Sequence, residues 1–321
     1  MARNFGRGGA GRGFCEGVHK YCSRPPPEQP HPAAGSDWKT LMQQRILRTA
    51  CRDETGLIAR IAGLCHEHGY NIHHQDQFVS SESTTFFMRT VLDGDFKESD
   101  GFISRLRGML PPGAVIELRD QSIRQRLAVL VTRESHCLGD ILIKAYSGAL
   151  DAEVVAVVGN YPDLQELSAK FEVPFYLVSH EGVSREAQEQ RLQEVLSACR
   201  PDLIVLAKYM RILSRQLVDS WQLGRMINIH HSFLPAFVGA RPYHQAFERG
   251  VKLIGATAHF VTSSLDQGPI ICQDVIKVNH RYTPETMARA GRDVERMVLI
   301  NALNKVLDYK VFIEGNKTIV F

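Results

Sequence analysis

The chain has 321 residues, of which 44% are hydrophobic and 23% are charged. This profile is typical of a globular protein with two domains, and no apolar run approaches the ~18 residues of a membrane-spanning helix. The formal net charge is +3. Residues 1–40 carry all of this excess, so the rest of the chain is net neutral and lacks the basic surface that nucleic-acid binding requires.

Residues 1–40 differ in composition from the rest of the chain, because twelve of them are Gly or Pro. Such a segment buries too little apolar surface to offset its ordering entropy, and we predict a disordered tail. It has no apolar secretory core. The seven Cys form no CxxC pair, which favours free thiols in a reducing compartment. We therefore expect a cytoplasmic protein. The alternative is an organellar protein, if the Arg-rich tail is a targeting peptide.

Residues 42–120 predict a small domain with the element order βαββαβ. The segment Thr55–Gly69 has apolar residues at helical spacing, and "ESDGFISRLRGML" predicts a second helix before a Pro-Pro-Gly stop. Strand-like runs flank both helices, and "SES" suits a turn between the second and third strands. This order is that of a ferredoxin-like fold.

The segment "CRDETGLIARI" resembles the pattern of ACT domains, in which an acidic turn and a glycine precede an apolar helix. The resemblance implies a regulatory domain that pairs subunits into a homo-oligomer and binds a small effector, commonly an amino acid. A dimerisation domain without a ligand is the alternative, because the βαββαβ frame has many uses.

Residues 121–126 are polar and charged and predict a linker, and residues 127–321 form the second predicted domain. Apolar strands alternate there with helical segments, which indicates a Rossmann-like, doubly wound α/β fold with a parallel sheet. A long helix is expected from Pro284 to about Leu307, followed by a hairpin that turns at Gly315. Ligands of such folds bind at the carboxyl ends of the strands.

Two polar residues end one of these buried strands. Asn228 and His230 in "MINIHH" are two positions apart and therefore share a face of the strand. An amide and an imidazole together could stabilise an oxyanion. Asp266 in "VTSSLDQGP" is the best candidate for a third, proton-handling group. Hydrogen-bonded structural residues and a simple turn are the alternative explanation of these three residues.

The segments "NIHHSFLPAF" and "GATAHFVTSSLDQGPII" resemble the signature of folate-dependent formyltransferases. In that family an Asn-x-His pair and a later Asp are catalytic, which implies catalytic roles for Asn228, His230 and Asp266. "LAKYMRIL" resembles the family's pterin pocket. The substrate-binding residues implied on this basis are Arg211, Ile212, Leu213, Val261 and Leu265. His244 is a further candidate, which could line the acceptor side of the site or pack within its loop.

The expected reaction depends on the formyl acceptor. Relatives that formylate a phosphosugar hold its phosphate with a Gly-rich loop, whereas "VTRESHCLGD" has bulky residues and the acidic Glu134 there. With the ACT-like half, the chain is most similar to the formyltetrahydrofolate deformylases. This resemblance implies hydrolysis of 10-formyltetrahydrofolate to tetrahydrofolate and formate in one-carbon and purine metabolism, without a cofactor. A formyltransferase to an unidentified amine and a non-catalytic folate or amino-acid sensor are the alternatives.

Three further sets of residues have weaker functional interpretations. Four histidines cluster in "HEHGYNIHH", but adjacent strand residues point to opposite faces, and we predict no metal site. Cys137 lies near a helix start, where a thiol is more easily ionised, but the expected mechanism needs no covalent step. His259 precedes the Asp266 loop and could orient it or simply be buried.

Overall fold

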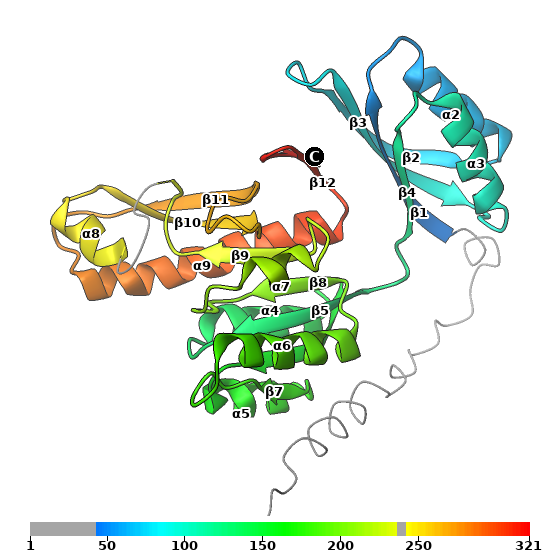
Figure 1. Cartoon of the computed structure of the whole chain (residues 1–321). Helices are drawn as coiled ribbons and strands as arrows, with labels where there is room; N and C mark the ends of the chain where they lie inside the picture. Colours follow the sequence, from blue (N-terminus) through cyan, green and yellow to red (C-terminus); the bar gives the residue numbers. More distant parts are fainter. Residues whose placement is uncertain (1–42, 236–241) are drawn as a thin grey trace, which may run out of the picture. The chain divides into compact units, whose positions relative to one another are not determined.

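The computed structural model describes residues 43–235 and 242–321. These residues form two compact units, one from residues 43–124 together with 305–321 and the other from residues 125–304 (Figure 1). The predicted disordered tail, residues 1–40, lies outside the described residues.

The N-terminal unit has the predicted βαββαβ order, and its four strands form one antiparallel sheet in the order β2-β3-β1-β4. Its elements are β1 (Gln43–Arg52), α2 (Leu57–Glu67), β2 (Asn71–Val79), β3 (Thr85–Gly94), α3 (Ser99–Met109) and β4 (Val115–Asp120). Gly56 precedes α2 with a φ of 89°, a conformation that L side chains rarely adopt. This backbone geometry explains the glycine of the ACT-like motif.

Helices α2 and α3 cover one face of this sheet (Figure 1). The buried residues of α2 include Leu57, Ile61 and Leu64, which lie on one side of the helix because they are three or four positions apart. They share a core cluster with Phe102 and Leu106 of α3 and with apolar residues of β1 and β3. The helical periodicity of the sequence thus predicted this helix and most of its buried side, although Ile58 at the same spacing is 41% exposed.

The C-terminal hairpin packs within the N-terminal unit, although the sequence boundaries grouped it with residues 127–321. Its strands are β12 (Val311–Glu314) and β13 (Lys317–Val320). The Phe312 ring lies 5.4 Å from the ring of Phe87, and the Arg48 guanidinium lies 4.2 Å above it. Arg48 also donates a hydrogen bond to the carbonyl of Val311 at 2.5 Å. Sequence order cannot reveal such a return, because it depends on contacts between residues more than 200 positions apart.

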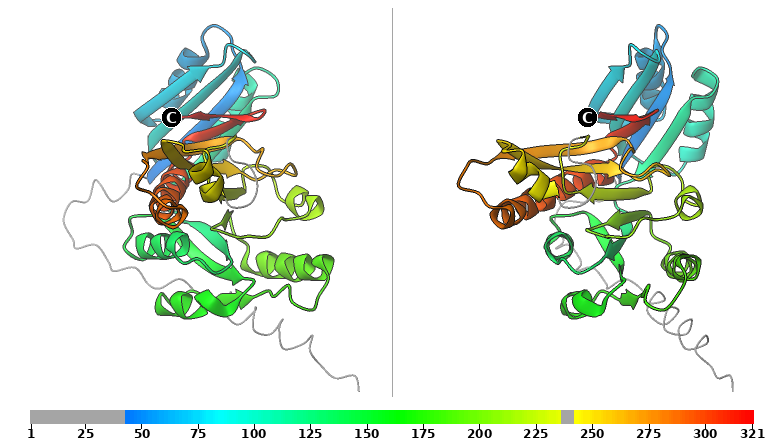
Figure 2. Two further views of the ribbon diagram at one scale, coloured as in Figure 1. Left: turned by 90° about the vertical axis from the view of Figure 1, so that its left-hand side faces the viewer. Right: turned by 60° about the vertical axis from the view of Figure 1, so that its left-hand side comes forward.

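The second unit is a seven-stranded sheet in the order β11-β10-β9-β8-β5-β6-β7. Its strands are β5 (Gln125–Val131), β6 (Ala152–Gly159), β7 (Phe175–Leu177), β8 (Leu203–Leu206), β9 (Met226–His230), β10 (Leu253–Phe260) and β11 (Ile270–Lys277). Its helices are α4 (His136–Tyr146), η1 (Pro162–Leu164), α5 (Gln165–Lys170), α6 (Arg185–Cys199), α7 (Arg215–Asp219), α8 (Pro242–Glu248) and α9 (Pro284–Leu307), the last of which ends in the other unit. Figure 2 shows α4 and α9 on one face of the sheet and α6 on the other.

Five of these strands, β5 to β9, are parallel as predicted, and their apolar sequences agree with burial under helices on both faces. Strands β10 and β11 are antiparallel to their neighbours, so the sheet is mixed. The direction of β10 matters for the site. Its last residue, Phe260, pairs with Ile227 near the start of β9, so residues 261–269 must turn back for Asp266 to reach the end of β9.

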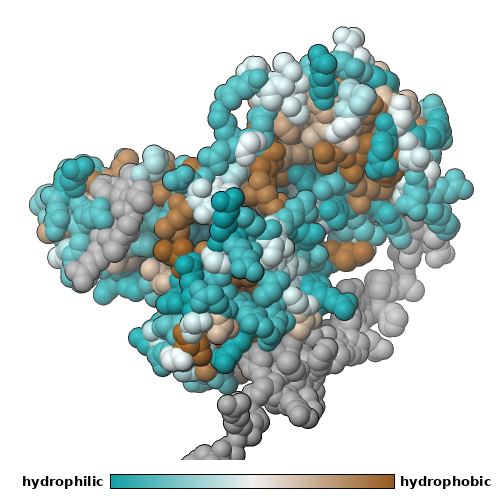
Figure 3. All heavy atoms as spheres, in the orientation of Figure 1, coloured by the Kyte–Doolittle hydropathy of each residue, from teal (hydrophilic) through white to brown (hydrophobic). Residues whose placement is uncertain are grey.

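The face of the molecule drawn in Figure 3 is mostly hydrophilic, with hydrophobic residues in smaller groups between the polar ones. Across residues 43–235 and 242–321, no helix combines the length and the hydrophobicity needed to cross a membrane.

Candidate active site

The Asp266 carboxylate lies between two imidazole rings, one of which belongs to the predicted catalytic residue His230. Its Oδ2 atom lies 3.3 Å from Nδ1 of His230, the last residue of β9. Its Oδ1 atom lies 3.7 Å from Nε2 of His259 on β10. Asp266 has a φ of 55°, so the loop turns sharply at the carboxylate itself. The structure thus brings His230 and Asp266 together across 36 positions of sequence.

The two imidazoles determine the charge of Asp266. The hydrogen bond with His230, and next the contact with His259, hold the pKa of the Asp266 carboxyl well below its usual range, although burial opposes this shift. Asp266 is therefore ionised throughout the physiological pH range. A permanent carboxylate is suited to hold an imidazole in one tautomer and to stabilise its protonated form.

His259 positions the side chain of Asn228. The two residues are direct cross-strand neighbours in β9 and β10. His259 Nδ1 lies 2.9 Å from the carbonyl oxygen of Phe260, which only accepts, so this nitrogen carries a proton. In the neutral ring, Nε2 then accepts a hydrogen bond from Nδ2 of Asn228 at 3.2 Å. His259 thus contacts both Asn228 and Asp266, which favours the orienting role over simple burial.

One ring nitrogen of His230 has a hydrogen-bond partner, and the other has none among the described residues. Because the Asp266 carboxylate only accepts hydrogen bonds, Nδ1 carries the proton, and Nε2 keeps its lone pair in the neutral ring. Nε2 is buried and has no hydrogen-bond partner among the described residues. Buried polar atoms are nearly always paired, so an unpaired imidazole nitrogen points to a water or a substrate as its partner.

A pocket of about 400 Å³ contains the three predicted catalytic residues and five of the predicted substrate-binding residues. These five are Arg211, Ile212, Leu213, Val261 and Leu265. The residues Ile212 and Leu265 are 62% and 57% exposed. Apolar side chains left exposed at a pocket are typical of a site that buries a flat, partly apolar ligand.

His244 does not lie with the other predicted substrate-binding residues. It is exposed on α8 and is not among the residues that line this pocket. The preceding residue, Tyr243, donates a hydrogen bond to Glu295 at 2.7 Å. Successive side chains of a helix point about 100° apart. Tyr243 therefore points toward Glu295, and His244 points away from it.

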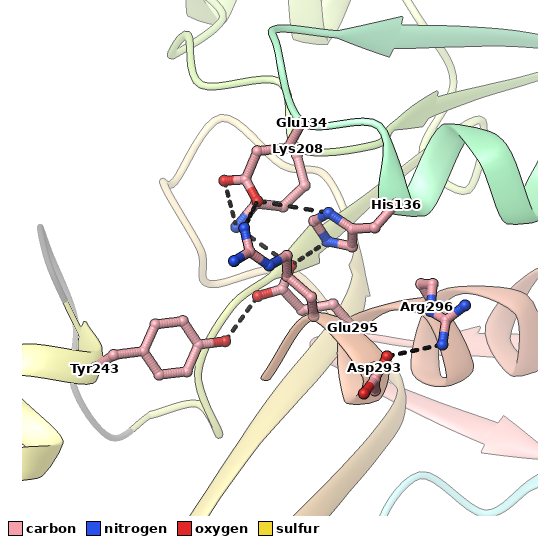
Figure 4. A network of polar contacts seen from close by, with 8 residues as sticks. Glu134, His136, Lys208, Tyr243, Asp293, Glu295 and Arg296 are labelled. Carbon is pink, nitrogen blue, oxygen red and sulfur yellow. Dashed lines mark hydrogen bonds and ion pairs between the residues drawn. The ribbon is translucent and has the colours of Figure 1, made fainter. Parts of the chain in front are cut away.

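A buried polar network lies beside the pocket (Figure 4). Glu295 of α9 is fully buried, and it accepts hydrogen bonds from Tyr243 and His136, each at 2.7 Å. The ammonium of Lys208, a residue that also lines the pocket, lies 3.3 Å from Glu295 and 3.9 Å from Glu134. Figure 4 shows Glu295 between Tyr243 and His136.

These contacts keep Glu295 charged. Burial alone raises the pKa of its carboxyl, but the hydrogen bond with His136, the charge of Lys208 and the hydrogen bond from Tyr243 together lower it to about 2. Lys208 and Glu295 were not among the functional residues predicted from the sequence. A signal was present, because Glu295 lies at core spacing with Val294, Val298 and Leu299, all buried residues of α9.

His136, Cys137 and Glu295 are the one group among the described residues whose side chains are close enough to share a metal ion. Glu295 already pairs with the Lys208 cation, and burial raises the pKa of the Cys137 thiol above its usual value. A neutral thiol is neither a nucleophile nor a good metal ligand. The contacts that Glu295 makes in this group belong to an ion-pair network with Lys208 and His136.

Known families match both halves of the chain. The Formyl transferase family model matches residues 125–303, and the ACT domain model matches residues 45–107. A formyltetrahydrofolate deformylase of Escherichia coli (strain K12) is 53% identical over 279 residues, which are 87% of this chain and 99% of that protein. The formyltetrahydrofolate deformylase of Haemophilus influenzae is 51% identical over 280 residues, 87% of this chain and 100% of that protein.

A solved structure agrees with these relatives. The crystal structure of a formyltetrahydrofolate deformylase from Pseudomonas syringae pv. tomato matches with a TM-score of 0.83 at 36% identity, covering 89% of this chain and 96% of that one. The predicted fold class, an ACT domain followed by a formyltransferase-type α/β domain, is confirmed.

The lowered pKa of His231 predicts that the free energy of unfolding of the second unit depends on pH. Burial, and next the charge of Lys208, lower its pKa from 6.5 to about 4. Between about pH 6.5 and pH 4 the unfolded chain therefore binds a proton that the folded chain does not, and stability decreases as the pH falls through this window. We expect His231→Gln to remove up to about 3 kcal/mol of this dependence. Urea unfolding at several pH values measures it, with His280→Gln, an exposed site, as the control. An unchanged pH dependence in His231→Gln would contradict the assignment.

Proposed function

Because the chain belongs to the formyltetrahydrofolate deformylase family, we infer that it is a hydrolase that converts 10-formyltetrahydrofolate and water to tetrahydrofolate and formate. The high identity over almost the whole length of the bacterial relatives carries this conclusion. Neither alternative, transfer to an amine or a non-catalytic sensor, is favoured by these relatives. The activity belongs to one-carbon metabolism and accords with purine metabolism, and we propose that it takes place in the cytoplasm, as expected from the bacterial relatives.

We assign catalysis to Asn228, His230 and Asp266. Water attacks the formyl carbon, and Nε2 of His230 accepts its proton. Asp266 holds Nδ1 and stabilises the imidazolium that forms, which fits a carboxylate whose two oxygens both face imidazoles. This assigns the proton transfer to His230, with Asp266 acting through it.

Asn228 and the protonated His230 then stabilise the tetrahedral oxyanion. His259 holds the Asn228 amide through the 3.2 Å contact, so that its donors are in place before the substrate binds. His230 returns its proton to N10, the C–N10 bond breaks, and formate leaves. Each step uses side chains of this chain, and we propose that no metal or redox cofactor takes part.

The substrate is proposed to bind with its pterin against the exposed apolar residues of the pocket. Ile212 and Leu213 belong to the loop after β8, and Val261 and Leu265 lie in the loop after β10. Two contacts support the first loop, because the Met210 amide donates to Thr132 at 2.9 Å and Arg185 donates to the Ile212 carbonyl at 2.8 Å. We place Arg211 at the anionic end of the substrate, where its charge is complementary.

Hydrolysis without any acceptor is the direct test. We expect the purified full chain to release formate and tetrahydrofolate from 10-formyltetrahydrofolate in equal amounts in plain buffer. Asp266→Asn and Asn228→Ala should each lower kcat by at least about 100-fold, because each removes a group that acts in the transition state. Asp274→Asn, an exposed position on β11 outside the pocket, is the control. Formate release that requires an added amine would refute the hydrolase function.

Leu265→Ala tests the pterin wall. Removing most of an apolar side chain that substrate binding buries should raise KM by about tenfold, or ~1.4 kcal/mol, and leave kcat nearly unchanged. Leu223→Ala is the matched control, since Leu223 is also exposed but lies outside the pocket. Equal KM values for both variants would remove Leu265 from the proposed substrate site.

We propose that the N-terminal unit pairs copies of the chain into a homo-oligomer and holds an amino-acid effector. The ACT match supports this, as does edge strand β2, where Phe78 and Val79 are 45% and 43% exposed. Unpaired edge strands with exposed apolar residues favour pairing between chains. Light scattering should give a multiple of the chain mass, and added amino acids should shift the thermal midpoint. A monomer that no amino acid stabilises would exclude both roles.

A further inference from the structure

The ion pair between Lys208 and Glu295 lies beside the catalytic residues. Lys208 and His231 line the same pocket as Asn228, His230 and Asp266. The His231 ring lies 5.2 Å from the ring of His230. The charges of Lys208 and Glu295 act on His231 together with those of the catalytic pair. Through Lys208, the network therefore borders the pocket that contains the predicted catalytic residues.

The backbone at Lys208 is strained. Its φ is 61°, in the left-handed region that glycine adopts freely and that a long side chain adopts at a cost of about 1 kcal/mol or more. Its ammonium is also almost fully buried, since the residue is only 6% exposed. Two unfavourable features at one pocket residue indicate that the lysine side chain itself is needed there.

An amine acceptor would meet two obstacles beside Lys208 and Glu295. Small amines approach mainly as ammonium ions at neutral pH, and the Lys208 ammonium has the same charge. A carboxylate could hold such an ammonium and take its proton, but Glu295 already has three partners, namely Lys208, His136 and Tyr243. Water is small and neutral and meets neither obstacle.

We propose that Lys208, paired with Glu295, takes the place of an amine acceptor and restricts the nucleophile of this site to water. The wall formed by this ion pair and His231 thus determines hydrolysis over transfer. The inference rests on the proposed hydrolase function and deepens it, because the same catalytic residues could serve either nucleophile.

The competing reaction is formyl transfer to an amine, and it needs no reactant besides the amine and 10-formyltetrahydrofolate. A neutral amine nitrogen forms a bond to the formyl carbon, the bond from that carbon to N10 breaks, and one proton passes from the amine to N10. The products are an N-formyl amine and tetrahydrofolate. In the hydrolytic reaction the products are formate and tetrahydrofolate, so the ratio of N-formyl amine to formate reports which nucleophile reacted.

Glycinamide is a suitable probe, since its amino group resembles an α-amino group with a pKa of about 8 and is partly neutral at pH 8. The full-length chain is incubated with 10-formyltetrahydrofolate and glycinamide, and N-formylglycinamide and formate are measured by mass spectrometry. Lys208→Gly relaxes the backbone, opens space and exposes Glu295. Lys208→Arg keeps the charge and is the matched control.

We expect the ratio of N-formylglycinamide to formate to rise at least about tenfold in Lys208→Gly and to stay at the wild-type level in Lys208→Arg. The double variant Lys208→Gly/Glu295→Gln leaves no unpaired buried charge, so it serves where the single variant does not fold. We expect the double variant to transfer more than the wild type but less than Lys208→Gly, because it lacks the carboxylate.

A wild-type ratio in a folded Lys208→Gly, or in the double variant where the single one does not fold, would overturn the proposal. Folding is established by thermal melting and by binding of tetrahydrofolate. The proposed function is tested separately, because formate release by the wild type without glycinamide does not depend on Lys208. If the wild type released no formate without glycinamide, the proposed hydrolase function would be refuted, and not only the proposed role of Lys208.

Discussion

The contact of the Asp266 carboxylate with two imidazoles is the interaction on which this site depends. A carboxylate between His230 and His259 stays ionised, fixes the proton of His230 on Nδ1 and leaves Nε2 available to the pocket. His259 in turn holds Asn228 across the β9–β10 pair. Four polar groups from two strands and one loop are thereby oriented without a substrate, which is the preorganisation that electrostatic catalysis requires.

The sheet provides the positions for these contacts. Because β10 runs antiparallel to β9, His259 lies directly opposite Asn228. The same direction carries the chain away from the end of β9, so the loop of residues 261–269 must fold back before Asp266 meets His230. That loop also contributes Val261 and Leu265 to the pocket, so one reversal of the chain brings the predicted catalytic carboxylate and two apolar residues to the same pocket.

The burial of Glu295 underlies the proposed restriction of the nucleophile to water. A fully buried carboxylate is stable only when it is paired, and the pairing here uses a lysine in a strained conformation. Three helices and the loop after β8 meet at this one charge. His136 begins α4, Tyr243 lies on α8, Glu295 lies on α9, and Lys208 lies in the loop after β8. In the function that we propose, the protein's own groups therefore occupy the place of an acceptor beside Lys208.

Much of this architecture followed from the sequence because its cause is local. Periodicity located the helices and strands of both units, and the alternation of apolar strands with helices indicated the doubly wound sheet. The spacing of Asn228 and His230 placed both on one face of a strand, and the motif around Asp266 marked the third residue. The resemblance to the family's motifs, rather than spacing, linked that residue to the other two.

Only the tertiary structure decided the rest, because it depends on contacts between distant segments. The C-terminal hairpin belongs with the N-terminal unit because Phe312 packs against Arg48 and Phe87. His244 lies away from the pocket because α8 turns Tyr243 toward Glu295. Lys208 and Glu295, 87 positions apart, form an ion pair only because α9 covers the face of the sheet beside the end of β8. Local sequence determines which element forms, whereas the meeting of two buried charges is decided by how those elements pack.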